Sequence, residues 1–161
     1  MKPLIDKLYG TLISTGNAMQ PAFLLMVRLY WGWQFIQTGW GKVHNLAKVT
    51  SFFTELGIPA PAVNATFVSG LELVGGALLV AGLFSRPIAL MMTVNMLVAY
   101  VTADREALMS IFSDPGKFYG ATPYTFLFAA LLILVFGPGK YSADAALAAR
   151  SQVHGGAAGA V

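Results

Sequence analysis

The chain has 161 residues, of which 57% are apolar and only 11% are charged, with a mean hydropathy of +0.67 and a net charge of +3. A soluble domain carries about 25% charged residues, and at this length much of its surface needs polar cover, so the composition indicates a membrane protein. The absence of cysteine excludes disulfides, iron–sulfur ligation and thiol redox chemistry carried by this chain, and the absence of a basic cluster gives no sign of a nucleic-acid partner.

The N-terminal segment, residues 1–20, places Leu4, Ile5, Leu8 and Leu12 at helical spacing. This spacing fits a short helix over 3–14 that lies in the membrane interface. A flexible terminus explains the same residues equally well, so both descriptions stay open for this segment.

The first spanning helix is expected over 21–40, where Pro21 suits a first helical turn. Arg28 lies near its middle, and Trp40 at its end is typical of the membrane interface. A polar connection over 41–61 follows, and within it residues 46–56 fit a short amphipathic helix. We assign the interface to four residues near the ends of spans: Trp40, Lys42, His44 and Arg86.

A second span is expected over 62–84, with Glu72 as its single charge near the middle. A helix of this length measures roughly 34 Å, enough to cross a bilayer. The third span, 87–103, carries Asn95 near its centre, and the fourth, 122–137, has no polar side chain in its core. The tail over 140–161 is rich in Ala and Gly and is expected to be partly disordered, with a short helix over 142–153.

These elements predict an all-α integral membrane four-helix bundle over 21–139. An even number of spans puts both termini on one side of the membrane. Apart from Arg28 within the first span, the Lys and Arg residues divide five to four between the two sides, which favours cytoplasmic termini.

Three spans carry a polar residue near the centre: Arg28, Glu72 and Asn95. Antiparallel neighbours are expected to meet centre to centre, which would pair the Arg28 guanidinium with the Glu72 carboxylate. The small residues Gly32, Gly39, Ser69, Gly75 and Gly76 lie on or beside the faces that carry the two charges, as expected where helices approach closely in lipid.

This buried polar site has two interpretations. The pair can fix helix register, or it can bind a substrate, a proton or a quinone, because ionisable residues inside a membrane are candidate functional residues. The aromatics Trp31, Trp33 and Phe35 are candidates for a pocket beside it, with a core or lipid-facing role as the alternative. His44 and His154 are too remote in the sequence to predict a metal site, and no catalytic residue is identified.

An ordered set of motifs resembles the DoxX family of small four-helix membrane proteins of bacteria and archaea. The set comprises Arg28, the run Gly39-Trp40-x-Lys42, Gly57-Ile58-Pro59, Glu72-x-x-Gly75-Gly76 and Gly82-Leu83-Phe84-x-Arg86. The likeness covers about residues 22–137. Relatives often carry His where this chain has Thr38.

The family takes its name from a subunit of a thiosulfate:quinone oxidoreductase. The resemblance therefore implies a multi-pass protein of the bacterial or archaeal cytoplasmic (inner) membrane that belongs to a redox system, with a quinone as the cofactor to consider and a soluble redox protein or a second copy as partner. A non-catalytic membrane anchor, assembly factor or chaperone is the alternative, and a small-solute transporter is the third.

Overall fold

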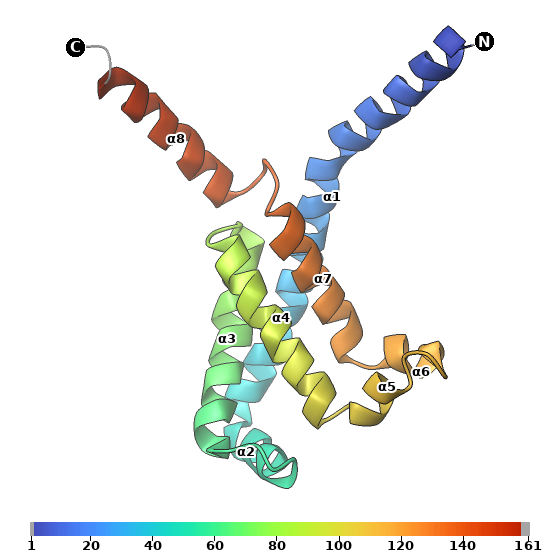
Figure 1. Cartoon of the computed structure of the whole chain (residues 1–161). Helices are drawn as coiled ribbons and strands as arrows, with labels where there is room; N and C mark the ends of the chain where they lie inside the picture. The colour runs from blue at the N-terminus through green and yellow to red at the C-terminus, as the bar shows by residue number, and fades with distance from the viewer. Residues whose placement is uncertain (1, 159–161) are drawn as a thin grey trace.

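The computed structural model describes the backbone of residues 2–158 and the side chains of residues 4–151, and all its regular elements are helices (Figure 1). This confirms the all-α prediction for the described part of the chain. The helices are α1 (Lys2–His44), α2 (Leu46–Glu55), α3 (Pro61–Ala81), α4 (Ser85–Thr102), α5 (Arg105–Met109), α6 (Pro115–Gly120), α7 (Pro123–Phe136) and α8 (Ala143–Ala158).

Helix α1 is one continuous helix of 43 residues, so the expected short helix over 3–14 and the span over 21–40 are parts of one element. At about 1.5 Å per residue it is roughly 65 Å long, about twice the thickness of a bilayer's hydrocarbon core. Pro21 lies inside α1 and not at a helix start. Every side chain from residue 4 to residue 20 is exposed, and this part of α1 extends away from the bundle (Figure 1).

Helices α3, α4 and α7 agree closely with the spans predicted over 62–84, 87–103 and 122–137. Among the described residues, α3 is the one helix whose length and composition suit a membrane crossing, and α7 is apolar but shorter. The helical part of the fold prediction is thus confirmed, while the crossing of a membrane by four helices stays a prediction.

The contact between α1 and α3 depends on glycines on both helices. A Cβ atom added to Gly76 would lie 2.8 Å from the Gly32 carbonyl oxygen, and one added to Gly39 would collide with the backbone of Glu72 and Leu73. The two backbones can approach this closely only because neither glycine carries a side chain. This confirms that the predicted small-residue faces pack against each other.

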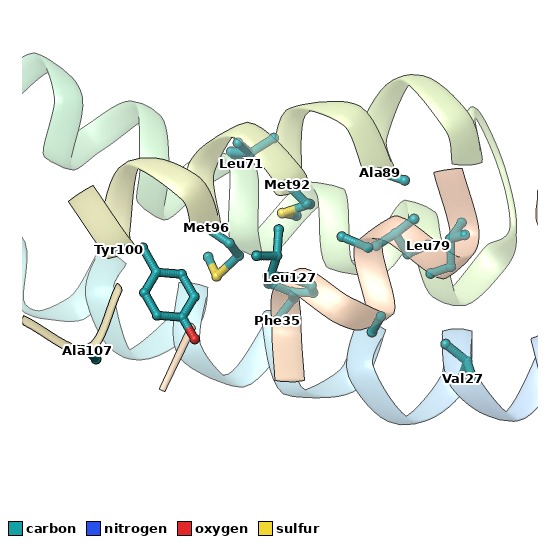
Figure 2. Packing of buried hydrophobic residues seen from close by; sticks show 13 residues of the cluster. Val27, Phe35, Leu71, Leu79, Ala89, Met92, Met96, Tyr100, Ala107 and Leu127 are labelled. Carbon is teal, nitrogen blue, oxygen red and sulfur yellow. The ribbon is translucent and has the colours of Figure 1, made fainter. Parts of the chain in front are cut away.

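The buried core lies where α3, α4 and α7 meet the C-terminal half of α1 (Figure 2). Tyr100 is fully buried and donates a hydrogen bond of 2.8 Å to the carbonyl oxygen of Phe118, which attaches α6 to α4. The largest side chains of this core are Phe35, Leu71, Leu79, Met92, Met96, Tyr100, Leu127 and Ile133.

Helix α8 reaches Ala158, beyond the predicted 142–153, and projects away from the bundle at the same end as the start of α1 (Figure 1). Its first turn is attached to the bundle through Asp144, whose carboxylate accepts hydrogen bonds from the N–H groups of Phe84 (2.8 Å) and Ser85 (2.9 Å). These N–H groups form the N-terminus of α4, where a negative charge is favourable. The end predicted to be disordered, 155–161, is helical over 155–158, and residues 159–161 lie outside the described residues.

Candidate functional site

A cavity of about 680 Å³ opens between the C-terminal part of α1 and helices α2, α3, α4 and α7. Its wall is mostly apolar. Aromatic side chains line it from three helices: Phe35 from α1, Phe52 and Phe53 from α2, and Phe126 from α7. Polar side chains that reach it include Lys42, Glu72 and Asn95.

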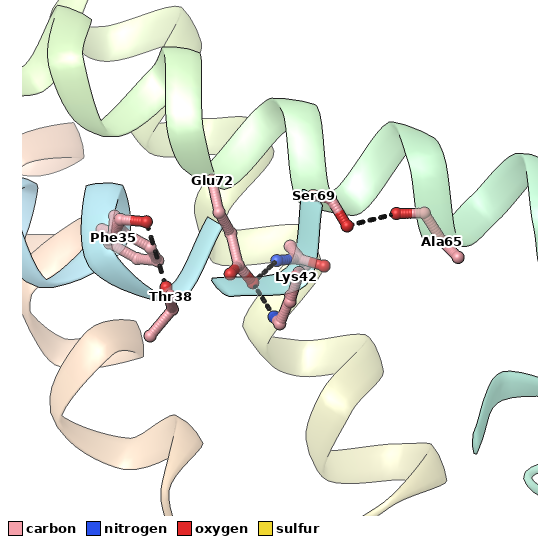
Figure 3. Close-up of polar contacts among 7 residues, drawn as sticks. Phe35, Thr38, Lys42, Ala65, Ser69 and Glu72 are labelled. Atoms are coloured by element: carbon pink, nitrogen blue, oxygen red, sulfur yellow. Dashed lines mark hydrogen bonds and ion pairs between the residues drawn. The ribbon is translucent and has the colours of Figure 1, made fainter. Parts of the chain in front are cut away.

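These three polar residues form one hydrogen-bonded cluster. The Glu72 Oε1 atom accepts a hydrogen bond from Lys42 Nζ at 2.5 Å and another from Asn95 Nδ2 at 3.1 Å (Figure 3). Glu72 is only 1% exposed, whereas the Lys42 side chain is 34% exposed. The ammonium therefore links a buried carboxylate to the open part of the cavity.

The second carboxylate oxygen, Glu72 Oε2, is buried and has no hydrogen-bond partner in the described part of the chain. A buried acceptor left without a donor costs about 1–3 kcal/mol, and more when the group is charged. The cluster is therefore only half satisfied by the protein itself.

The predicted pair between Arg28 and Glu72 is not formed, and this expectation was wrong. Gly32 lies level with Gly76 and Gly39 level with Leu73, so α1 and α3 are antiparallel in a register that puts Arg28 opposite the C-terminal end of α3. Side chains on a helix also tilt toward its own N-terminus. In an antiparallel pair, Arg28 and Glu72 consequently lean away from each other.

Arg28 instead holds the end of α3. Its Nε donates to the carbonyl oxygen of Leu79 at 3.0 Å, one terminal nitrogen donates to Val80 at 3.2 Å and the other to Pro138 at 2.5 Å. The last carbonyls of a helix lack partners within the helix, and a guanidinium satisfies them with charge-assisted bonds. Arg28 is 2% exposed, does not line the cavity and joins α1, α3 and the turn after α7.

Of the three aromatic residues predicted to line a pocket, one lines the cavity and two do not. Phe35 is buried and lines the cavity, where its ring lies 4.8 Å from that of Phe126. Trp31 packs against the core and Trp33 is 56% exposed, and neither of them lines the cavity. The two tryptophans were therefore placed wrongly, because the face of α1 that carries Phe35 turns them away from this space.

Of the four residues assigned to the interface, three lie at the surface and one belongs to the buried polar cluster. Trp40 is 59% exposed and its ring lies 4.2 Å from that of His44, while Arg86 is exposed with one weak hydrogen bond of 3.4 Å to the Val135 carbonyl oxygen. Lys42 was expected beside them but belongs to the site as the partner of Glu72. The signal that could have found it is its spacing: Lys42 follows Gly39, the residue of closest approach to α3, by three positions and so lies on the same helical face.

The family model described as DoxX matches residues 23–105, about half of the chain. The chain belongs to the DoxX family. This confirms the resemblance seen in the sequence motifs, and the DoxX protein is a membrane protein.

A relative of this DoxX protein is described as an uncharacterized membrane protein of Mycobacterium tuberculosis. The two are 28% identical over 151 residues, which cover 86% of this chain and 90% of the relative. No solved structure matches the chain significantly. The family match includes Arg28, Lys42, Glu72 and Asn95, whereas α7 and α8 lie beyond it.

Proposed function

We propose that this DoxX protein is the membrane subunit of a redox system and that its cavity binds a quinone. The observation that supports the proposal is the ion pair of Lys42 and Glu72 at the wall of an otherwise apolar cavity. The volume of about 680 Å³ lies within the range of small-molecule sites. A quinone combines a ring that carries two carbonyl acceptors with an apolar tail, and both parts have counterparts here.

Each part of the cavity then has a role in quinone binding. Lys42 has one of its three N–H groups on Glu72 and can direct another to a quinone carbonyl. Phe52, Phe53 and Phe126 supply apolar surface for the ring and tail. Asn95 holds Glu72 in place through Oε1.

Reduction of a quinone to a hydroquinone takes up two electrons and two protons. We expect a soluble partner protein to deliver the electrons, because this chain has no cysteine for thiol redox chemistry. Glu72 Oε1 already accepts hydrogen bonds from Lys42 and Asn95, so we assign Glu72 a role in binding the ligand.

The test uses the purified protein in lipid nanodiscs and decylubiquinone as the probe, with binding measured by calorimetry. Ala99→Phe fills the cavity from α4 and should weaken binding by at least tenfold. Val94→Phe adds the same side chain on an exposed part of α4 that does not line the cavity, and it should leave binding unchanged. Absence of binding to the wild-type protein would reject the proposal.

We also propose that α3, α4, α7 and the C-terminal half of α1 cross the cytoplasmic membrane with both termini inside. The absence of native cysteine allows a direct test with single cysteines. Ser113→Cys, between α5 and α6, should react with a membrane-impermeant maleimide in intact cells, and Ser151→Cys in α8 should react only after lysis. Reaction of both residues in intact cells would contradict this topology.

An anchoring or assembly function is the second candidate, and the exposed N-terminal part of α1 favours it. Leu4, Ile5, Leu8 and Leu12 on this segment are each more than 60% exposed and lie beyond the bundle. Deletion of residues 2–18 would then abolish co-purification of a partner protein while leaving quinone binding intact. A quinone-binding subunit without this function would show no change in partner recovery.

A further inference from the structure

We infer that the ligand of the cavity carries a hydroxyl group that donates a hydrogen bond to Glu72 Oε2. This deepens the proposed quinone site and rests on it in one respect: within a quinone pair, the hydroquinone should bind more tightly than the quinone. The shared chemistry is a neutral hydroxyl on a largely apolar body, which a hydroquinone or a long-chain lipid alcohol would supply.

The two oxygens of the Glu72 carboxylate are in different situations. Oε1 already accepts from two donors, Lys42 and Asn95, whereas Oε2 accepts from none in the described part of the chain. Glu72 is 1% exposed and lines the cavity, so a molecule bound in the cavity is the donor that we propose for Oε2.

Two hydroxyl groups on the helices of the ion pair, those of Thr38 and Ser69, donate to other acceptors. Thr38 Oγ1 donates to the Phe35 carbonyl oxygen at 3.0 Å, and Ser69 Oγ donates to the Ala65 carbonyl oxygen at 2.6 Å (Figure 3). Each of these bonds lies within the residue's own helix. Neither side chain therefore satisfies Oε2, although both belong to the helices that carry the ion pair.

Charge decides which kind of donor fits. Lys42 already balances the negative charge of Glu72. A cationic ligand would add an uncompensated charge to an apolar cavity, which is costly. An apolar ligand without a donor would leave Oε2 unsatisfied. A neutral hydroxyl is the donor that completes the site without changing its net charge.

The first experiment compares 4-decylphenol with 4-decylanisole, in which a methyl group replaces the hydroxyl hydrogen. Binding to the wild-type protein in nanodiscs should favour the phenol by about 10- to 100-fold, the range for a hydrogen bond to a charged group. Equal affinity for the two compounds would overturn the inference.

Glu72→Gln provides the matched variant. Lys42 and Asn95 both donate, so they should hold the amide oxygen of the new side chain in the place of Oε1. Its NH₂ group then faces the cavity where an acceptor stood, and the preference for the phenol should disappear or reverse. Retained binding of the anisole shows that the variant is folded, and a phenol preference that survives in it contradicts the inference.

Thr38→Val serves as the control. It removes a hydroxyl that lines the same cavity but is bonded to its own helix, so the phenol preference should be unchanged. Loss of the preference in this variant would assign the effect to Thr38 and overturn the role of Glu72.

The source of the hydroxyl is resolved by two further probes, decylubiquinol against decylubiquinone and 1-hexadecanol. Tighter binding of the quinol than of the quinone supports both the inference and the quinone function. Binding of the alcohol and the phenol, but of neither form of the quinone, supports the inference and rejects the quinone function. Quinone binding without any preference for hydroxyl groups supports the quinone function and rejects the inference. Failure of every probe to bind rejects both the inference and the quinone function.

Discussion

The ammonium of Lys42 lies 2.5 Å from the Glu72 carboxylate, and this ion pair joins the C-terminal end of α1 to the middle of α3. The partner of the most buried acid in the chain is therefore a residue that is one-third exposed. The pair connects the buried core to the cavity.

Lys42→Met should destabilise the protein by about 3 kcal/mol, because it leaves the Glu72 charge buried without its partner. This is the lower end of the usual range, since the exposed part of Lys42 is already screened by solvent. Lys48→Met is the control, since Lys48 also lines the cavity but forms no ion pair among the described residues. Thermal unfolding in detergent measures the loss of stability. The double variant Lys42→Met/Glu72→Gln should regain most of the stability that Lys42→Met loses. A Lys42→Met variant as stable as the wild type would refute the pairing of Lys42 with Glu72.

Arg28→Ala should destabilise the bundle by about 3 kcal/mol, because it leaves one buried and two partly buried carbonyl groups without their donors. Arg28→Lys keeps the charge but loses the planar fork, and it should recover less than half of that stability. Arg86→Lys is the matched exposed control and should be close to neutral. Thermal unfolding monitored by circular dichroism measures the stability of all three variants. Equal stability of the Arg28→Lys variant and the wild type would show that the planar fork of the guanidinium is not needed.

Gly39→Ala should disrupt the contact between α1 and α3, because the added methyl group meets the backbone of Leu73 and not a movable side chain. We expect a loss of about 1–3 kcal/mol, typical of overpacking. Gly41→Ala, two residues later in the same helix, meets no atom within 4 Å and should gain up to about 1 kcal/mol from helix propensity. Opposite shifts in the unfolding temperature of the two variants are the expected result, and shifts of the same sign would argue against this packing.

Asp144 should make the attachment of α8 sensitive to acid. Burial alone would raise its pKa, but the hydrogen bonds from the N–H groups of Ser85 and Phe84 outweigh burial and hold the pKa below its usual value. The stabilisation is therefore fully present above the usual pKa of about 4 and is lost as pH falls through the lowered pKa.

Hydrogen exchange at Phe84 and Ser85, corrected for the intrinsic rate at each pH, measures this effect. Protection should fall at acidic pH in the wild type, and Asp144→Asn should reduce it at neutral pH. Asp6→Asn, on the exposed part of α1, is the control. Equal protection of Phe84 and Ser85 in the wild type and in Asp144→Asn would contradict the role of Asp144 at the start of α4.

Much of the secondary structure could be predicted from local sequence. The apolar runs placed α3, α4 and α7 within a few residues of their bounds, because hydrophobic segments between turn residues report where helices begin and end. The glycines on the faces of Arg28 and Glu72 identified the surfaces that meet, and Asn95, which the sequence analysis grouped with Glu72, donates a hydrogen bond to it. Each of these features is a property of a single helix.

Only the tertiary structure decided which residues meet across helices. The periodicity of α1 shows which face Arg28 occupies but not how far α1 is displaced along α3. Because of that displacement, Glu72 pairs with Lys42, and Arg28 binds the carbonyl groups at the end of α3. The attachment of α8 by Asp144 depends likewise on a contact between distant segments. Composition and periodicity describe each helix by itself, whereas register is set by the closest fit of two surfaces and by the tilt of side chains toward the N-terminus of each helix.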